Sequence, residues 1–155
     1  GIKNLWSAFI ELQKEFPNEW ELWCLGNGDV SPVNHPQIKH FGFIQPSDLN
    51  SYIKSTGVFV LPSFFEPWGV VVHEYASAGF PIICSDQVGA RTAFVENDYN
   101  GYIYKSDSVA ELKGAMIKII KSDVYDLNRM CERSVEKAKS ITPEKWVQQL
   151  MKLIK

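Results

Sequence analysis

The sequence has few cysteines, no surplus of charge of one sign and no long hydrophobic run. Its three cysteines, Cys24, Cys84 and Cys131, stand too far apart for a Cys-x-x-Cys zinc or redox motif, and their odd number argues against a disulfide framework. The net charge of −2 lacks the excess of Lys and Arg that a nucleic-acid partner requires. No apolar run reaches the roughly 18 residues of a membrane span, and no signal-peptide pattern opens the chain. We therefore expect a protein of the reducing cytoplasm that binds no nucleic acid.

Several motifs of known chemistry are also missing. Gly26-x-Gly28 is followed by Ser31 where a dinucleotide fingerprint needs Gly or Ala, and the sequence contains no Walker-type phosphate loop. The three histidines do not form a His-x3-His pair, and no Gly-x-Ser-x-Gly elbow occurs. We therefore expect no NAD, no P-loop chemistry, no hydrolase elbow and no metal ion.

What the sequence does have is the composition of one ordinary globular domain. Of its 155 residues, 45% are hydrophobic and 22% are charged. A domain of this size buries roughly 68–70% of the surface that its unfolded chain exposes, so it can fold without disulfides or a metal ion. The chain begins with Gly1 instead of Met and enters a helical pattern almost at once, so we interpret it as part of a longer protein.

Strand and helix patterns alternate along the chain. Short apolar runs bounded by Gly, Pro or polar residues predict strands at 22–25, 38–44, 58–61, 82–84 and 101–104. Apolar residues at helical spacing predict helices at 5–16, 47–55 with Ser47 as N-cap, 70–78, 109–119, 124–138 and, after a start at Thr142-Pro143, 146–154. This alternation predicts an α/β fold: an open, mainly parallel, Rossmann-like sheet of about five strands with helices on both faces.

Ligands of such sheets bind at the carboxyl ends of the strands. Polar segments with glycines follow four of the predicted strands, so we expect these ends to form one cleft. The predicted cleft-lining residues are Gly26, Gly28, Ser63 and Gly89.

The segment from Pro62 to Glu74 joins a strand, a turn and the start of a helix. A helix N-terminus offers free N–H groups and the positive end of its dipole, which suit a pyrophosphate. Gly69 permits close approach to the backbone, Glu74 suits a ribose diol, and Glu66 suits the hydroxyls of a sugar. The structural alternative is that Glu66 is an ordinary helix-start carboxylate and Glu74 a solvated helix residue. The spacing alone does not exclude this, since two other glutamate pairs of this chain also stand eight positions apart.

The run from Glu66 to Glu74 and the following Gly79-Phe80-Pro81 resemble the Glu-x7-Glu signature of family-four glycosyltransferases of the GT-B fold. The likeness extends through 85–89 and 100–101, and back through Gly26-x-Gly28 and Phe41-x-Phe43 to the first helix. The resemblance therefore covers nearly the whole chain, with a specific central motif and weaker flanks.

The resemblance implies that residues 1–155 form a single nucleotide-sugar-binding domain, the C-terminal half of a retaining two-domain enzyme. The N-terminal acceptor domain and the first strand would be absent, so this part alone would be inactive. The donor would be a UDP-, GDP- or ADP-sugar bound without a metal ion. The implied acceptor is a glycan or lipid-linked glycan of polysaccharide biosynthesis, and the complete enzyme would be cytoplasmic or peripheral to the membrane.

The resemblance also implies the roles of individual residues. Glu66 would be the catalytic residue that holds the donor sugar, and Glu74 would bind the ribose. The donor sugar and diphosphate would contact Pro67, Trp68, Gly69 and Val70, and the base would lie near Phe43 and Ile44.

Some residues depart from the family pattern, and other functions stay open. The basic pair that usually precedes the first helix would lie before Gly1, and Ala93 stands where an acidic residue is common. We interpret Tyr75 as a packing residue, and His73 as lying on another helix face than Glu74. The alternatives are a sugar-nucleotide epimerase, a phosphorylase-like GT-B domain, or a non-enzymatic receiver-like interaction domain.

Overall fold

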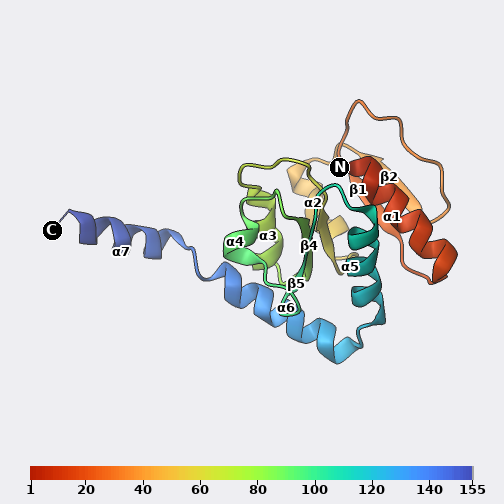
Figure 1. The fold of residues 1–155 in the computed structure, drawn as a ribbon. Helices are drawn as coiled ribbons and strands as arrows, with labels where there is room; N and C mark the ends of the chain where they lie inside the picture. The colour runs from red at the N-terminus through yellow and green to blue at the C-terminus, as the bar shows by residue number, and fades with distance from the viewer. Residues whose placement is uncertain (155) are drawn as a thin grey trace.

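The computed structural model describes residues 1–154, and its helices and strands follow the alternation that the sequence predicts (Figure 1). In chain order they are α1 (Ile2–Glu15), β1 (Leu22–Leu25), β2 (Ile38–Gly42), α2 (Pro46–Ile53), β3 (Phe59–Leu61), α3 (Val70–Ser77), β4 (Ile82–Ser85), α4 (Arg91–Phe94), β5 (Gly101–Tyr104), α5 (Val109–Lys121), α6 (Val124–Ala138) and α7 (Pro143–Leu153). The α/β class is confirmed.

All the strand pairs of the described residues are parallel, as predicted, but the strands do not form one sheet. β1 pairs with β2 in a two-stranded sheet, and β3, β4 and β5 form a second sheet in that order. The expectation of a single sheet of about five strands was therefore wrong. Within residues 1–154, β1 and β3 do not pair, and apolar cavities lined by residues of both strands separate them.

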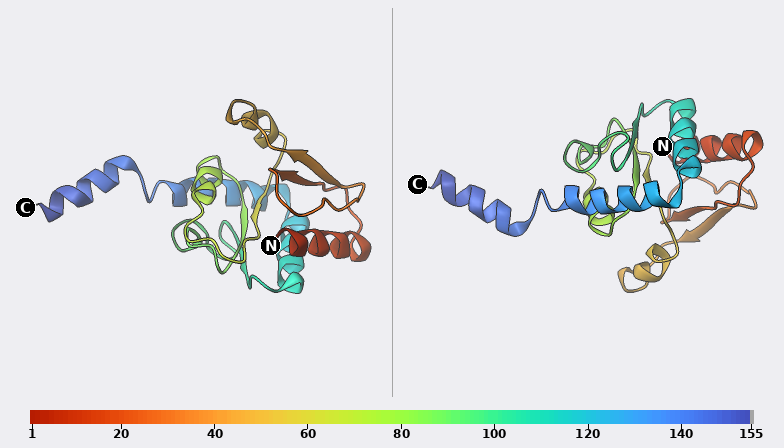
Figure 2. Two further views of the ribbon diagram at one scale, coloured as in Figure 1. Left: turned by 90° about the horizontal axis from the view of Figure 1, so that it is seen from above. Right: turned by 90° about the horizontal axis from the view of Figure 1, so that it is seen from below.

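Side chains of the three-stranded sheet alternate between two cores, because neighbouring residues of a strand point to opposite faces. Ile83 of β4 belongs to a core built with α1 and α5, which also buries Leu12 and Leu112. Ile82 and Cys84 of the same strand belong to a second core built with α3, α4 and the end of α6. Helices therefore cover both faces of the sheet, as the sequence predicted (Figure 2).

Helix starts follow the expected chemistry, with two corrections. Thr142 caps α7, since its Oγ1 accepts a hydrogen bond of 3.3 Å from the N–H of Lys145. Ser47 does not cap α2: Pro46 is the first helical residue and Gln45 the cap, because proline fits the first turn of a helix. The short helix α4 was not predicted, because four residues are too few to show a helical period.

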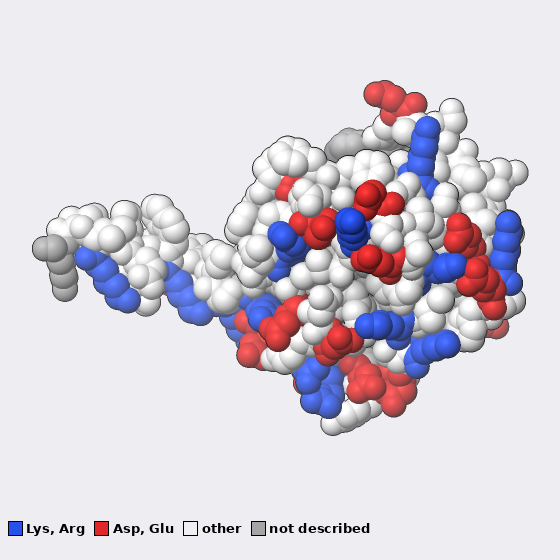
Figure 3. Space-filling model, in the orientation of Figure 1, with Lys and Arg blue, Asp and Glu red and all other residues white. Residues whose placement is uncertain are grey.

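α7 extends away from the rest of the molecule in every view, and it buries none of its residues (Figures 1 and 2). In Figure 3, basic side chains lie along the lower edge of α7 and uncharged side chains along its upper edge, while acidic and basic groups alternate over the visible face of the globular part. No helix within residues 1–154 has both the length and the apolar character that crossing a membrane demands.

Candidate functional site

The loop between β3 and α3 lies along the loop between β4 and α4. Glu66, in the first of these loops, forms an isolated parallel bridge with Val88 in the second. The N–H of Glu66 donates to the carbonyl of Gln87 at 3.1 Å, and the carbonyl of Glu66 accepts from the N–H of Gly89 at 2.9 Å. The backbone of Glu66, the residue whose carboxylate the resemblance implies is catalytic, is thus fixed from both sides.

Further hydrogen bonds join these two loops at both ends. The N–H of Ala90 donates to the carbonyl of Trp68 at 2.7 Å. The buried hydroxyl of Ser85, the last residue of β4, donates to the carbonyl of Ser63 at 2.5 Å. The predicted cleft residue Ser63 therefore has its carbonyl engaged in holding the loop.

Two glycines permit this close approach of the loops. A Cβ atom on Gly89 would lie 2.1 Å from the carbonyl oxygen of Pro67, which is a severe overlap with backbone. Gly69 has a φ of +86°, in the left-handed region that glycine occupies without strain, and its Cβ would lie 3.0 Å from Cγ of Glu66. Both positions therefore require glycine for the shape of the site.

The N-terminus of α3 presents unpaired backbone donors. Gly69 is the N-cap and its carbonyl accepts from the N–H of Val72 at 2.9 Å. Within residues 1–154, the N–H groups of Val70 and Val71 have no acceptor, and the side chain of Val70 is exposed. Because the positive end of the helix dipole lies at the same place, this end of α3 is suited to an anion.

Two carboxylates flank this helix start, Glu66 before it and Glu74 one turn into it. Glu66 is half-buried and Glu74 is exposed. Neither forms an ion pair with another residue of the described part of the chain, so both are free to accept hydrogen bonds. Glu74 lines the cavity at the carboxyl ends of β1 and β3, together with Leu61 and Pro62. Glu66 lies outside that cavity.

The other predicted cleft residues lie at the carboxyl edge of the two-stranded sheet. Gly26 has a φ of +115°, and its N–H donates to the carbonyl of Gly42 at 2.7 Å, while Gly28 is exposed. Phe43 is 64% exposed and Ile44 is half-buried. None of these four predicted residues lines the cavity that contains Glu74. The strand predicted to reach Ile44 ends at Gly42, where a φ of +67° turns the chain.

Three side chains near the motif pack against neighbouring elements. The Trp68 ring meets Phe94 edge-on at 6.3 Å and remains 45% exposed. His73 stacks on Phe94 at 4.3 Å, and its Nε2 lies 3.1 Å from the carbonyl oxygen of Ala138. Tyr75 stacks on Phe59 at 3.9 Å between ring centroids. Tyr75 thus has the packing role that the sequence predicted, and His73 packs between Phe94 and the end of α6.

Sequence reasoning missed three residues that support the loops. Asp86 accepts from the N–H of Ser106 at 3.1 Å and ties the loop after β5 to the loop after β4. Arg91 donates to the carbonyl of Val88 at 3.1 Å. Cys84 lies beneath the loops, where burial raises the pKa of its thiol to about 12 and keeps it protonated. The residues 1–154 contain no cluster of three or more metal-ligating side chains.

Comparison with known proteins identifies the family. The family of glycosyl transferases group 1 matches residues 33–141. An uncharacterized glycosyltransferase of Methanocaldococcus jannaschii is 35% identical over 81 residues, which are 50% of this chain and 20% of that protein. A galactosyltransferase of Escherichia coli, named UDP-Gal:alpha-D-GlcNAc-diphosphoundecaprenol alpha-1,3-galactosyltransferase, is 23% identical over 90 residues, which are 57% of this chain and 23% of that protein.

The fold agrees with the family. The solved C-terminal domain of a group 1 glycosyl transferase from Francisella tularensis superposes with a TM-score of 0.73 at 18% identity, over 90% of this chain and 78% of that one. This chain belongs to the glycosyl transferases group 1 family, and its fold is that of a GT-B glycosyltransferase domain. It spans between 13% and 37% of the length of the curated relatives that it matches.

Proposed function

We propose that this chain is the donor-binding domain of a glycosyltransferase that takes its sugar from a nucleotide diphosphate sugar. The carrying observation is the free N-terminus of α3 flanked by Glu66 and Glu74, neither of which has an ion-pair partner within residues 1–154. Membership of the glycosyltransferase family supports this reading over a receiver-like interaction domain. Family membership also favours the donor-binding domain of a glycosyltransferase over an epimerase or a phosphorylase.

Each part of the donor has a partner of matching chemistry in this arrangement. The diphosphate would lie at the N–H groups of Val70 and Val71, with Gly69 leaving room for its oxygens. Glu74 would accept hydrogen bonds from the two ribose hydroxyls. Glu66 would accept hydrogen bonds from hydroxyls of the transferred sugar, with Pro67 and Trp68 beside it, and the base would extend toward Phe43 and Ile44.

The proposed mechanism relies on position and charge. As the bond from the anomeric carbon to the diphosphate oxygen breaks, negative charge grows on the leaving group, where the helix dipole and the free N–H groups stabilise it. Glu66 would hold the sugar ring in a fixed orientation toward the acceptor. We assign no covalent nucleophile and no metal ion, and we propose that the anomeric configuration is retained.

The acceptor and the setting of the complete enzyme are part of the proposal. The Escherichia coli relative is named for a lipid diphosphate acceptor, which supports a glycan or lipid-linked glycan as acceptor here. We infer that another domain of the full-length protein binds it, so residues 1–155 alone would bind donor without transferring sugar. The full-length enzyme would work in the cytoplasm or at the inner face of its membrane.

The test is ligand-observed saturation-transfer NMR with UDP, GDP and ADP and their common sugar conjugates. We expect ribose signals from at least one nucleotide with the wild-type chain, and their loss in Glu74→Ala. Glu132→Ala is the matched control, because Glu132 is also an exposed helix glutamate without an ion pair in the described chain. Silence from every nucleotide, or equal signals in both variants, would contradict the proposal.

A further inference from the structure

The imidazole of His73 joins three helices that are far apart in the sequence. His73 belongs to α3, and its ring stacks on Phe94 of α4 with 4.3 Å between ring centroids and 6° between ring planes. Its Nε2 lies 3.1 Å from the carbonyl oxygen of Ala138, the last residue of α6. The three helices also pack on one another (Figure 1). The first turn of α3 is thus connected to the end of α6 through one side chain.

The carbonyl of Ala138 depends on His73 for a well-formed hydrogen bond. The last carbonyls of a helix have no partner within the helix, and a histidine N–H is one of the groups that can satisfy them. Because a carbonyl can only accept, the proton lies on Nε2 of His73. The N–H of Ile141 also reaches this carbonyl, but at 3.4 Å, beyond the usual range. His73 is therefore a cap that α3 supplies to the C-terminus of α6.

The capped carbonyl lies where the chain leaves the globular part of the domain. Residues 139–142, which we call the α6–α7 joint, lead into α7, and residues 139–141 are exposed. α7 extends away from the globular part and buries none of its residues (Figure 2). Within residues 1–154, the bond from His73 is the one hydrogen bond that ties residues 138–142 to any element outside α6 and α7. This bond therefore holds the start of the joint to α3.

Two short routes connect the same imidazole to the candidate site. Along the backbone, His73 lies three residues after Val70 on a helix of eight residues, about 12 Å long, which moves as one body. Through side chains, the ring of Phe94 lies against both His73 and Trp68. Phe94 is fully buried, so its ring has no free space in which to absorb a movement of either neighbour. A displacement of the start of α3 therefore reaches His73 directly.

We propose that His73 couples the start of α3 to the α6–α7 joint, so that a nucleoside diphosphate bound at Gly69–Val71 changes the hydrogen bond at Ala138. The anion attracts the positive end of the α3 dipole, and the helix carries His73 with it. The two states of the joint are those with and without the His73 bond. Because such coupling is reciprocal, a change at the joint alters the affinity for the nucleotide by the same factor. This inference rests on the proposed function, which supplies the nucleotide.

A packing role alone does not account for the imidazole. A phenylalanine at position 73 would also stack on Phe94, because the stack uses only the flat ring. The Ala138 carbonyl would then keep only its long contact with Ile141. The feature that packing does not require is the Nε2–H group, and this group makes the contact with the joint.

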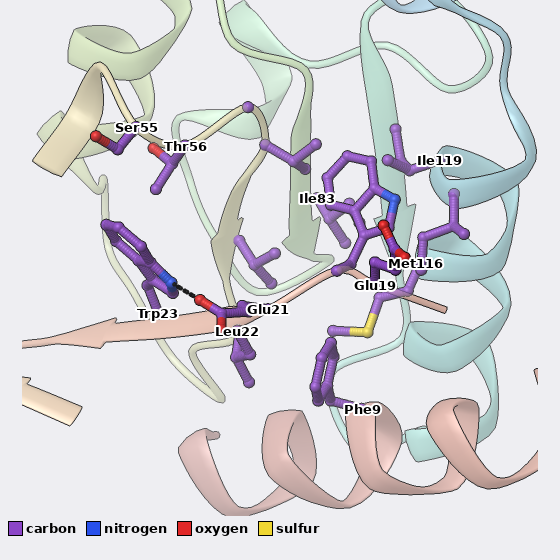
Figure 4. A pocket seen from close by; sticks show the side chains of 15 residues that line it. Phe9, Glu19, Glu21, Leu22, Trp23, Ser55, Thr56, Ile83, Met116 and Ile119 are labelled. Carbon is purple, nitrogen blue, oxygen red and sulfur yellow. Dashed lines mark hydrogen bonds between the residues drawn. The ribbon is translucent and has the colours of Figure 1, made fainter. Parts of the chain in front are cut away.

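The test begins with amide chemical-shift mapping of the wild-type chain with UDP, GDP and ADP. The nucleotide that shifts Gly69–Val71 should also shift the amides of 139–142, with the same dependence on nucleotide concentration. The Nε2–H signal of His73 should shift with them. Met116 and Ile119 of α5 line the apolar cavity on the other face of the three-stranded sheet (Figure 4). Their amides serve as the reference and should not shift.

Two variants separate the hydrogen bond from the stacking. His73→Phe keeps a flat ring beside Phe94 and removes the donor. His73→Gln places an amide N–H about as far from the backbone as the Nε2–H of histidine. We expect His73→Phe to keep the nucleotide shifts at Gly69–Val71 and to lose those at 139–142. We expect His73→Gln to keep both sets of shifts.

The outcomes distinguish this coupling from the proposed function. Shifts at Gly69–Val71 without shifts at 139–142 or at the Nε2–H of His73 in the wild-type chain would overturn the coupling and leave the proposed function intact. Equal shifts at 139–142 in wild type and His73→Phe would also overturn it, because the signal would then travel by another route. No shift at Gly69–Val71 with any nucleotide would contradict the proposed function and the coupling together.

Discussion

Replacing Gly89 with alanine should loosen the site and destabilise the domain. The new Cβ would lie 2.1 Å from the Pro67 carbonyl oxygen and 3.2 Å from Cα of Trp68, so the backbone of the β3–α3 loop must move. That movement breaks the hydrogen bonds from Gly89 to Glu66 and from Ala90 to Trp68, of 2.9 and 2.7 Å. At about 1 kcal/mol for each bond, plus residual overlap, the loss in free energy of unfolding is about 2 to 3 kcal/mol.

The assay is urea denaturation followed by circular dichroism, with Gly114→Ala as the matched control. Gly114 lies within α5 and has open space around it, so alanine there should stabilise the domain by about 0.5 to 1 kcal/mol. In a domain of this size, Gly89→Ala should lower the Tm by about 4 to 12 °C. A Gly89→Ala chain within about 0.5 kcal/mol of wild type would refute the claim that the loops touch at this glycine.

Three further changes test the packing. Asn100→Ala should lower the free energy of unfolding, measured by urea denaturation, by about 3 to 4 kcal/mol, because the buried side chain forms hydrogen bonds with Phe94, Glu96 and Ser134. A loss below about 1 kcal/mol would contradict that network. From pH 9 to 12 only the unfolded chain loses the Cys84 proton, because burial raises the pKa of the native thiol from 9.0 to about 12. The free energy of unfolding should therefore fall by up to about 1.4 kcal/mol per pH unit as the pH rises. If Cys84→Ala shows the same dependence on pH as the wild-type chain, the prediction is wrong. Ending the chain at residue 141 should change stability by less than about 0.5 kcal/mol, because α7 buries no residue, and a larger loss would show that α7 packs on the domain.

The sequence predicts the strands and most helices well, because their residues carry local signals. The apolar run Val58 to Leu61 predicts a buried strand, and β3 forms there with half-buried residues. Gly79 ends α3 with a φ of +80°. Thr142-Pro143 begins α7 because both residues suit a helix start. Local chemistry alone settles these positions.

The separation into two sheets could not be predicted in this way. Runs 22–25 and 58–61 both have the composition of buried strands, and nothing in either run says that the other is not its neighbour. Whether these two strands pair depends on how the whole domain packs, which neither run encodes locally. The same limit explains why one five-stranded sheet was expected.

The sequence predicts the Glu66–Glu74 segment of the candidate site, but not the contacts from other loops that hold this segment in place. The strand–turn–helix pattern is enough to place Glu66, Gly69 and Glu74 around the start of a helix. Gly89 was expected to line the cleft. In the structure, the close approach of the Pro67 carbonyl oxygen explains why this position needs a residue without a side chain. The contact between a glycine and a loop distant in the sequence depends on the tertiary fold, and the local sequence does not predict it.

The most direct test of the central claim is amide chemical-shift mapping of the chain with UDP, GDP and ADP. The account predicts that one nucleotide shifts the N–H signals of Gly69, Val70 and Val71 most strongly, with Glu74 also affected. These shifts should be absent in Glu74→Ala at the same nucleotide concentration, while Glu132→Ala should keep them. Shifts that cluster away from the start of α3, or none with any nucleotide, would contradict the account.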